Sequence, residues 1–470
     1  MSVGTQPCPP PSVMPVIFVP GIMGSRLKNA RTGRLAWDPG SNLGTAWEGY
    51  TQGAAGKRAR LVGAPSGGFD PGLLEVDYGD SSAPYHDRGW GGLMQDFYGG
   101  FVTWLQHTAA QPGAGVVRRG CFNIHYEAYA HPYNWMDSNI ESGQKLGDRV
   151  DQAIAETEET YGDRDVNILK PVIITHSMGG LVCRAFTEMH GGASKVHAVI
   201  HGAMPTHGSP ATYKRIMAGF EGWYISPARH VLGANQRETT ATAGNGPGPL
   251  SLLPNDHHVS VDGSAPWLKA TGRSGSTLWS RPSGSPYSEI YLDQSHWWRM
   301  IYARYLNPAG GRSEATEFRG FRAELNKAKA LHDGIAPSGY HANTRMIYVD
   351  SDELPSFDHV EWKQSLSQDT PPSGSYRNST TGTLTWSELI DTGVMMGGGM
   401  RSMNVPVTRY EIQDGDAPGD GTVHAGSGRH VSGPMVVATR RGAEHDQTFN
   451  SSEVKGLVAQ YLYDFVQEQN

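Results

Sequence analysis

The residues whose chemistry stands out first lie in the stretch PVIITHSMGGLVCR, residues 171–184. Its apolar beginning predicts a buried strand, and the residues from Gly179 onward predict a helix. A serine in a sharp turn between a strand and a helix holds its hydroxyl above the sheet, and the next backbone N–H points at the oxygen of a reacting carbonyl. We therefore predict that Ser177 is a nucleophile and that Met178 donates to the oxyanion. The competing interpretation is an ordinary serine cap at the start of a helix.

The usual pattern of such a turn is G-x-S-x-G, in which small residues let the strand and the helix approach each other. Thr175 stands in place of the first glycine. Threonine is small but branched at Cβ, so the match is weaker at this position. The strand pattern before the serine and the helix pattern after it support the prediction.

A nucleophile of this kind needs a base, and the histidine that serves as base should lie between the last strand and the last helix. His445, in RRGAEHDQTFN, lies between the predicted strand 434–440 and the predicted helix 453–468. His430 precedes that strand, and His424 lies close to the candidate acid. We therefore predict His445 as the base.

The acid that orients this histidine should follow a late strand and precede the histidine in the chain. The stretch QDGDAPGDGTV offers Asp414, Asp416 and Asp420. We choose Asp420, because the glycines on either side let the backbone turn so that the carboxylate can reach an imidazole. Asp350, at the end of the predicted strand 344–350, is the rival.

The spacing of Asp414 and Asp416 also occurs in calcium-binding loops. In this chain Pro418 and Ala425 occupy positions that would have to bind the ion, so the calcium pattern fails. We therefore expect no metal ion, and no motif indicates a cofactor.

The second oxyanion donor should come from the turn after the first core strand. The apolar run 15–19 predicts that strand, and PGIMG, residues 20–24, predicts a turn with free backbone amides. We predict that Ile22 donates the second hydrogen bond. The alternative interpretation is a plain glycine-rich turn.

Strands and helices alternate along much of the chain. Strands are predicted at 15–19, 122–130, 171–175, 196–204, 344–350, 407–412 and 434–440, and helices at 93–107, 142–161, 179–190 and 453–468. This alternation predicts an α/β fold with a mostly parallel central sheet flanked by helices. We divide the chain into a loose leader at 1–14, a first part of the core at 15–204, an inserted cap or lid at 205–340 and a second part of the core at 341–470, with a flexible excursion at 351–406.

The inserted regions are rich in large apolar side chains. They include GFEGWYI at 219–225, Trp267, Trp279, Trp297, Trp298, Met300, Met395 and Met396. These side chains predict either an acyl-chain tunnel or lid that meets lipid, or ordinary core packing. The glycines at 397–399 predict a lid hinge or a flexible loop.

The composition excludes several classes of protein. A net charge of −7 over 470 residues gives no reason to expect a nucleic-acid partner. Three cysteines, Cys8, Cys121 and Cys183, do not form a disulfide framework. The first residues lack the pattern of a signal peptide, and no apolar run reaches the ~18 residues of a membrane span. We therefore expect synthesis and folding in the cytoplasm.

Six segments occur in the same order in a known family: VIFVPGIMGSRL, HPYNWMDS, THSMGGLVCR, SLLPN, GDGTV and the segment with His445. In these segments the chain resembles the α/β-hydrolase lipases similar to lecithin–cholesterol acyltransferase and lysosomal phospholipase A2. The resemblance implies a triad of Ser177, Asp420 and His445, with Ile22 and Met178 as oxyanion donors. Asn134 replaces the aspartate of the family's PYDW motif, so the role of that aspartate does not carry over.

The resemblance implies serine-dependent hydrolysis of lipid carboxylic esters, as a phospholipase A or lipase, with transient contact with a membrane or micelle. Two alternatives remain: an acyltransferase that moves the acyl chain to an alcohol, and a catalytically inactive hydrolase scaffold that binds a partner. The family members are secreted and disulfide-linked, which this chain does not match. Analogy with bacterial phospholipase effectors of type VI secretion implies export without a signal peptide and a secretion-system or immunity protein as partner.

Overall fold

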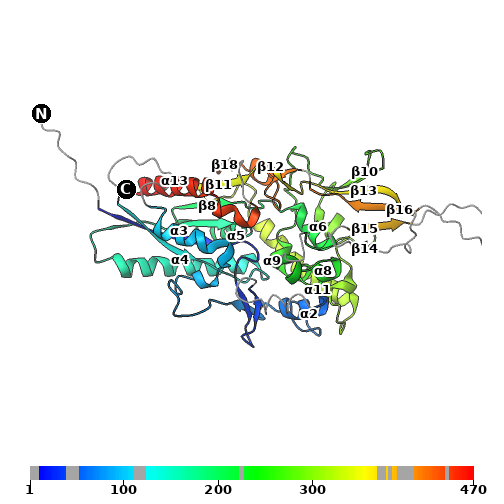
Figure 1. The fold of residues 1–470 in the computed structure, drawn as a ribbon, viewed down its shortest axis with the longest axis horizontal. Coiled ribbons are helices and arrows are strands. Elements are labelled where there is room, and N and C mark those ends of the chain that lie inside the picture. The colour runs from blue at the N-terminus through cyan, green and yellow to red at the C-terminus, as the bar shows by residue number, and fades with distance from the viewer. Residues whose placement is uncertain are drawn as a thin grey trace, which may run out of the picture.

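The computed structural model describes residues 10–38, 52–110, 123–221, 227–367, 377–378, 384–388, 407–415, 417–439 and 444–470. These residues form a core sheet with flanking helices and a cap that lies beyond one end of the sheet (Figure 1). The C-terminus lies at the end of the molecule away from the cap.

The core sheet has seven strands in the order β18-β11-β8-β7-β1-β5, with β6 paired to β1. All its pairings are parallel. The strands are β1 (Ser12–Val19), β5 (Ile124–Ala130), β6 (Asn167–Ile168), β7 (Val172–His176), β8 (Ala198–Gly202), β11 (Thr344–Val349) and β18 (Met435–Thr439). β1, β7 and β8 are buried along their whole length, as apolar strands covered on both faces must be. Because the strands are parallel, their carboxyl ends meet at one edge.

Helices cover this sheet: α3 (Gly100–His107), α4 (Asn139–Tyr161), α5 (Gly179–Arg184) and α13 (Ser452–Gln469). α4 and α5 pack on each other and on β1, while α3 packs on β5. α4 buries a stripe that includes Leu146, Val150 and Ala153, spaced by three and four residues. The Ser138 hydroxyl accepts a backbone N–H at the start of α4, so this helix begins before the predicted position 142.

The cap contains a second sheet of six strands in the order β10-β9-β13-β16-β15-β14. They are β9 (Leu268–Thr271), β10 (Thr277–Arg281), β13 (Val360–Ser367), β14 (Arg377–Asn378), β15 (Leu384–Glu388) and β16 (Val407–Ile412). The prediction that 407–412 continues the core sheet is wrong, because β16 pairs antiparallel with β13 and β15. The local pattern of a strand identifies the strand but not its neighbours in space.

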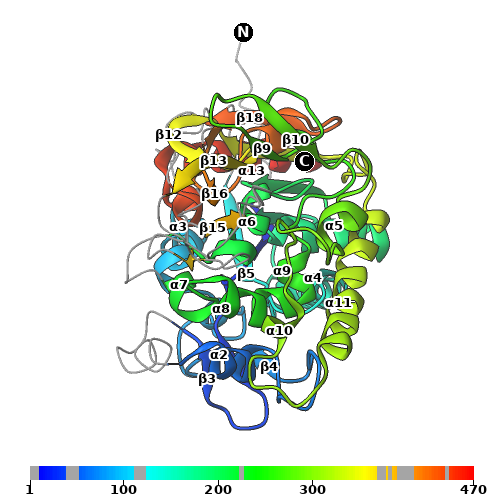
Figure 2. The same cartoon turned by 90° about the vertical axis from the view of Figure 1, so that its right-hand side faces the viewer.

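The helices of the cap lie beside this second sheet (Figure 2). They are α6 (Pro210–Ala218), α7 (Pro227–Val231), α8 (Gln236–Ala241), η5 (Ala243–Asn245), α9 (Pro247–Leu250), η6 (Tyr287–Tyr291), α10 (Ala303–Leu306) and α11 (Glu314–Gly334). Four tryptophans and a methionine from the predicted tunnel or lid instead belong to the hydrophobic core of the cap or pack against it: Trp267, Trp279, Trp297, Trp298 and Met300. Core packing is therefore the correct interpretation of these side chains. Residues 395–399 lie outside the described residues.

Smaller elements complete the chain. β2 (Leu27–Asn29), β3 (Leu35–Trp37) and β4 (Leu74–Val76) form a three-stranded sheet, and β12 (Ser351–Ser356) pairs with β17 (Ala417–Gly419). The remaining helices are α2 (Ala54–Leu61), η1 (Trp90–Gly92), η2 (Gln95–Gly99), η3 (Ala185–Met189), η4 (Gly192–Lys195), α12 (Gly426–Arg429) and η7 (His445–Asn450).

The start of the core strand is a second correction. β1 begins at Ser12, which pairs with Ile124, so the last residues of the predicted leader 1–14 belong to the sheet. Cys183 is a buried free thiol, and Cys8 and Cys121 lie outside the described residues. Among the helices that the structure describes, none has the length and apolarity needed to cross a bilayer.

Candidate active site

The turn between β7 and α5 carries Ser177. The φ angle of this serine is +52°, a left-handed value that is uncommon outside glycine and occurs at functional sites. A Cβ on Gly179 would lie 2.5 Å from the carbonyl oxygens of Val19 and Pro20, and one on Gly180 would lie 2.3 Å from the sulfur of Met204. The close approach of the helix to the backbone after β1 therefore needs glycine at position 179, whereas a side chain at position 180 would have to displace the flexible side chain of Met204.

Thr175 takes the place of the first glycine without leaving its hydroxyl unpaired. Its Oγ1 is 2.8 Å from Nδ1 of His201 on β8, and both side chains are buried. A branched residue is thus accommodated inside the sheet because the neighbouring strand supplies a polar partner.

Three side chains that are far apart in the sequence meet at this turn. The Oγ of Ser177 is 2.8 Å from Nε2 of His445, and Nδ1 of His445 is 2.7 Å from Oδ2 of Asp420. A carboxylate can only accept, so Nδ1–H of His445 donates to Asp420 and Nε2 accepts the hydroxyl proton of Ser177. The arrangement is that of a nucleophile, its base and an acid that orients the base.

The position of Asp420 is set by its own loop. Its Oδ1 accepts the backbone N–H groups of Thr422 and Val423 at 2.9 and 2.7 Å, and its side chain is 2% exposed. Burial by itself would raise the pKa of Asp420, but the charge and hydrogen bond of His445 and the two backbone amides lower it below its usual value. Asp420 therefore stays ionised and can stabilise a protonated imidazole.

The rival acid and the two histidines that were not chosen have partners outside the triad. Both carboxylate oxygens of Asp350 accept from Arg429 at 2.7 Å, in an ion pair apart from Ser177. Nδ1 of His424 lies 3.1 Å from Asp358, and Nε2 of His430 lies 3.2 Å from the carbonyl oxygen of Val261. Asp416 lies outside the described residues.

The two predicted oxyanion donors flank the serine. The turn after β1 lies directly on the serine turn, since a Cβ on Gly21 would be 2.9 Å from Cβ of Ser177. Within the part of the chain that the structure describes, neither the Ile22 N–H nor the Met178 N–H donates a hydrogen bond. Both amides are thus available to an oxyanion, and their role stays a prediction.

A cavity of about 490 Å³ opens at the serine, at the carboxyl ends of the core strands. Its polar end is formed by Ser177, His445 and their neighbours. The cap supplies an apolar wall made of Ile216, Phe220, Ala228, Leu232, Ala243, Pro249 and Leu252. Within the described residues, no group of three or more His, Cys, Asp or Glu side chains is arranged to hold a metal ion.

The cavity also contains a charged pair, Arg215 and Glu221, that was not predicted from the sequence. Nη2 of Arg215 donates to Oγ1 of Thr422 at 3.2 Å, and its Nε donates to Glu221 at 2.9 Å. Burial would raise the pKa of Glu221, but Arg215 and Lys214 lower it to about 2. No motif marks these residues, because only the fold brings α6 next to the loop of Asp420.

One family model and one solved structure agree with this architecture. Residues 118–222, less than half of the chain, match the family model described as a PGAP1-like alpha/beta domain. None of the curated proteins compared with the chain matches it. A chain in the crystal structure of the Tle4–Tli4 complex is 22% identical, with a TM-score of 0.71, over 97% of this chain and 99% of that chain. Phospholipase PlaB from Legionella pneumophila is 15% identical over 68% of this chain and 78% of that chain, with a TM-score of 0.19.

The parallel sheet, the serine turn and the shared fold define the chain as a protein with the α/β-hydrolase fold, which confirms the fold expected from the sequence. The segment that matches the PGAP1-like model runs from before β5 to beyond β8, and it includes Ser177.

Proposed function

We propose that this chain is a serine esterase that hydrolyses carboxylic esters of lipids, with phospholipids as the substrate class. The observation that carries the proposal is the continuous hydrogen-bonded chain from Ser177 through His445 to Asp420 at the polar end of a cavity with an apolar wall. Such a cavity suits an ester whose acyl chain needs to leave water.

The acylation step follows from the hydrogen bonds. Nε2 of His445 takes the proton of Ser177 as Oγ attacks the ester carbonyl carbon, and the resulting oxyanion accepts the N–H groups of Ile22 and Met178. The imidazolium, stabilised by Asp420, then gives its proton to the leaving alkoxide. The bond between the carbonyl carbon and the alcohol oxygen breaks, and the acyl group remains on Ser177.

Deacylation uses the same groups in the reverse order. His445 takes a proton from a water molecule, whose oxygen attacks the acyl carbon, and then returns the proton to Oγ of Ser177. The product is a fatty acid. An alcohol in place of water would give a new ester, which is the acyltransferase alternative.

The test is hydrolysis of phospholipid vesicles and of short-chain acyl esters by wild type and by Ser177→Ala. We expect the variant to lose about 10³-fold or more of kcat while it keeps its fold, because the nucleophile is gone. A Ser177→Ala protein that cleaves esters at the wild-type rate would refute the proposal.

Two further measurements separate the alternatives. Labelling of Ser177 by a fluorophosphonate reports an activated serine, and its absence in folded wild type would favour a binding scaffold. Product analysis in the presence of a short-chain alcohol separates free fatty acid from a new ester.

We also propose, by analogy with the Tle4–Tli4 complex, that the chain has a protein partner. Action after export, expected from the sequence, remains a separate proposal. The test for the partner is copurification of the chain from its own cells, followed by an esterase assay of the bound and free fractions. Esterase activity that is suppressed in a stoichiometric complex supports the proposal, and a chain that is isolated alone from those cells contradicts it.

A further inference from the structure

A buried tyrosine hydroxyl lies between the two segments that carry the predicted oxyanion donors. The Oη of Tyr98, in η2, accepts the backbone N–H of Gly21 at 3.2 Å and lies 2.7 Å from Nδ1 of His176. Gly21 precedes Ile22, and His176 precedes Ser177 and Met178. Tyr98 and His176 are each 2% exposed. One hydroxyl thus connects the turn after β1 to the serine turn.

With the ring proton of His176 on Nε2, Nδ1 accepts the hydroxyl proton of Tyr98, and the Tyr98 oxygen accepts the N–H of Gly21. Burial, followed by the nearby charge of His445, lowers the pKa of His176 to about 3. Burial likewise raises the pKa of Tyr98. His176 is therefore neutral at physiological pH and adds no positive charge beside His445, whose ring centre is 4.8 Å away.

The packing leaves little freedom for either segment. A Cβ on Gly21 would lie 3.1 Å from Nδ1 of His176, and one on Gly24 would lie 2.7 Å from the ring of Tyr98. Met23, between these glycines, has a φ angle of +62°. Trp37 and Tyr133 also hold this turn, by donating to the carbonyl oxygens of Met23 at 2.7 Å and Pro20 at 3.1 Å. The Tyr98 hydroxyl differs from these anchors because it also contacts His176, next to the serine turn.

We propose that Tyr98 and His176 are positioning residues, which hold the Ile22 and Met178 amides at the separation that an oxyanion requires. The inference rests on the proposed esterase function. Neither side chain touches the substrate, and both act through the backbone of the two turns. Preorganised N–H donors stabilise an oxyanion much less when they are displaced by a fraction of an ångström. Loss of the Tyr98 hydroxyl therefore weakens transition-state stabilisation more than it weakens substrate binding.

The test begins with Tyr98→Phe, which removes only the hydroxyl. With a short-chain ester we expect kcat to fall by about ten- to a hundredfold with KM within twofold of wild type. We expect the rate of fluorophosphonate labelling of Ser177 to fall by a similar factor, because the phosphonyl oxygen uses the same two amides. The matched control is Tyr291→Phe, which removes a buried hydroxyl that donates to the carbonyl of Pro254 in the cap. This control is expected to keep the wild-type kcat.

A second pair of variants tests Nδ1 of His176 as the acceptor of the Tyr98 hydroxyl. The same pair serves as the test if the Tyr98→Phe protein does not fold. His176→Asn keeps an acceptor near the position of Nδ1 and is expected to keep most of kcat, whereas His176→Leu is expected to match the loss of Tyr98→Phe. A Tyr98→Phe protein with kcat within twofold of wild type, or equal kcat in the two His176 variants, overturns the inference. Wild type without Ser177-dependent hydrolysis refutes the proposed function instead, so the two failures are distinguishable.

Discussion

At the scale of single residues, the two carboxylate oxygens of Asp420 have different partners. Oδ1 accepts two backbone amides of its own loop, while Oδ2 faces Nδ1 of His445. The backbone amides can only donate, so the oxygen that faces them needs to be an acceptor. The loop therefore fixes which atom of residue 420 faces the imidazole.

This asymmetry predicts the effect of Asp420→Asn. The amide oxygen should keep the two backbone donors, which leaves the NH2 group facing Nδ1 of His445. The imidazole then carries its proton on Nε2 and cannot accept the proton of Ser177. We expect a loss of about 10³- to 10⁴-fold in kcat, measured by steady-state ester hydrolysis.

The matched control is Asp350→Asn, which weakens the ion pair with Arg429 and leaves the triad intact. We expect its kcat to stay close to wild type. If Asp350→Asn lost activity and Asp420→Asn kept it, the assignment of the acid would be wrong.

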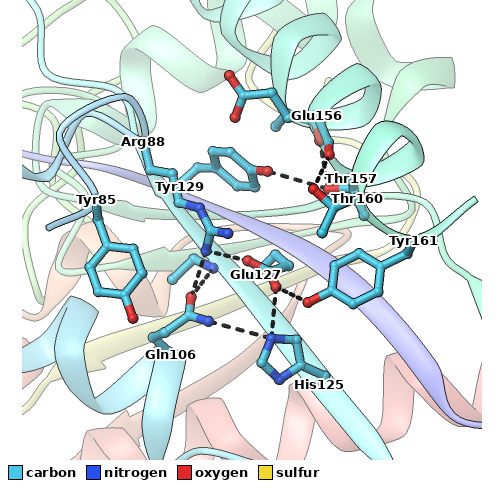
Figure 3. A network of polar contacts seen from close by, with 12 residues as sticks. Tyr85, Arg88, Gln106, His125, Glu127, Tyr129, Glu156, Thr157, Thr160 and Tyr161 are labelled. Carbon is cyan, nitrogen blue, oxygen red and sulfur yellow. Dashed lines mark hydrogen bonds and ion pairs between the residues drawn. The ribbon is translucent and has the colours of Figure 1, made fainter.

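At the scale of elements, the edge strand β5 is tied to its surroundings by a polar network around Glu127 (Figure 3). The carboxylate of Glu127, which is 4% exposed, pairs with Arg88, accepts the hydroxyl of Tyr161 at the end of α4 and lies 2.7 Å from Nε2 of His125. Ser177 of the triad follows the carboxyl end of β7, whereas Glu127 lies in the middle of β5. The network therefore stabilises the fold around β5 without taking part in the proposed reaction.

The network predicts a pH-dependent contribution to stability. Burial would raise the pKa of Glu127, but hydrogen bonds from His125 and Tyr161 and the charge of Arg88 lower it overall. A carboxyl whose pKa is lowered in the folded state stabilises the fold above its unfolded pKa of about 4.3. This stabilisation is lost as the pH falls through the lower folded-state value.

We therefore expect Glu127→Gln to lower the free energy of unfolding by roughly 2 kcal/mol at pH 7, measured in urea, with esterase activity unchanged. The difference from wild type should shrink as the pH is lowered below about 4. A difference that stays constant between pH 3 and pH 7 would contradict this role of the charged carboxylate.

At the scale of the whole molecule, the candidate site is formed by the core and the cap together. The core supplies Ser177, Asp420 and His445, and the cap supplies the apolar wall of the same cavity. Each part also has its own hydrophobic core, and the second sheet combines strands from both inserted regions. In the proposed esterase, the chemistry would therefore depend on the core and the choice among acyl chains on the cap.

This division predicts the effect of Ala243→Leu on the cap side of the cavity. The larger side chain takes volume that an extended acyl chain would occupy, and the loss of contact for one or two methylene groups is worth about 1–3 kcal/mol. We expect the ratio of kcat/KM for long-chain to short-chain esters to fall by about tenfold or more. Hydrolysis of the short-chain ester is the internal control, and an unchanged ratio would show that the acyl chain does not occupy this wall.

Much of the fold and the candidate site could be predicted from local patterns. The apolar runs identified β1, β7, β8, β11 and β18, and their order along the chain indicated a parallel sheet. The choice of Ser177, Asp420 and His445 followed from their positions relative to these strands, which the structure brings within hydrogen-bonding distance. The core strands and the turns that carry these three residues can be recognised from short stretches of sequence, because strand burial and turn conformation depend on residues close in sequence.

Only the tertiary structure decided the rest. β16 has the pattern of a strand, yet its antiparallel neighbours place it in the cap. The tryptophans of the cap could have lined a lipid tunnel or packed in a core, and only their contacts in the structure assign them to the core of the cap. Tyr98 meets His176 across 78 positions, and Arg215 meets Thr422 across 207. Contacts of this kind depend on where whole elements lie in space, for which the residues close in sequence carry no signal.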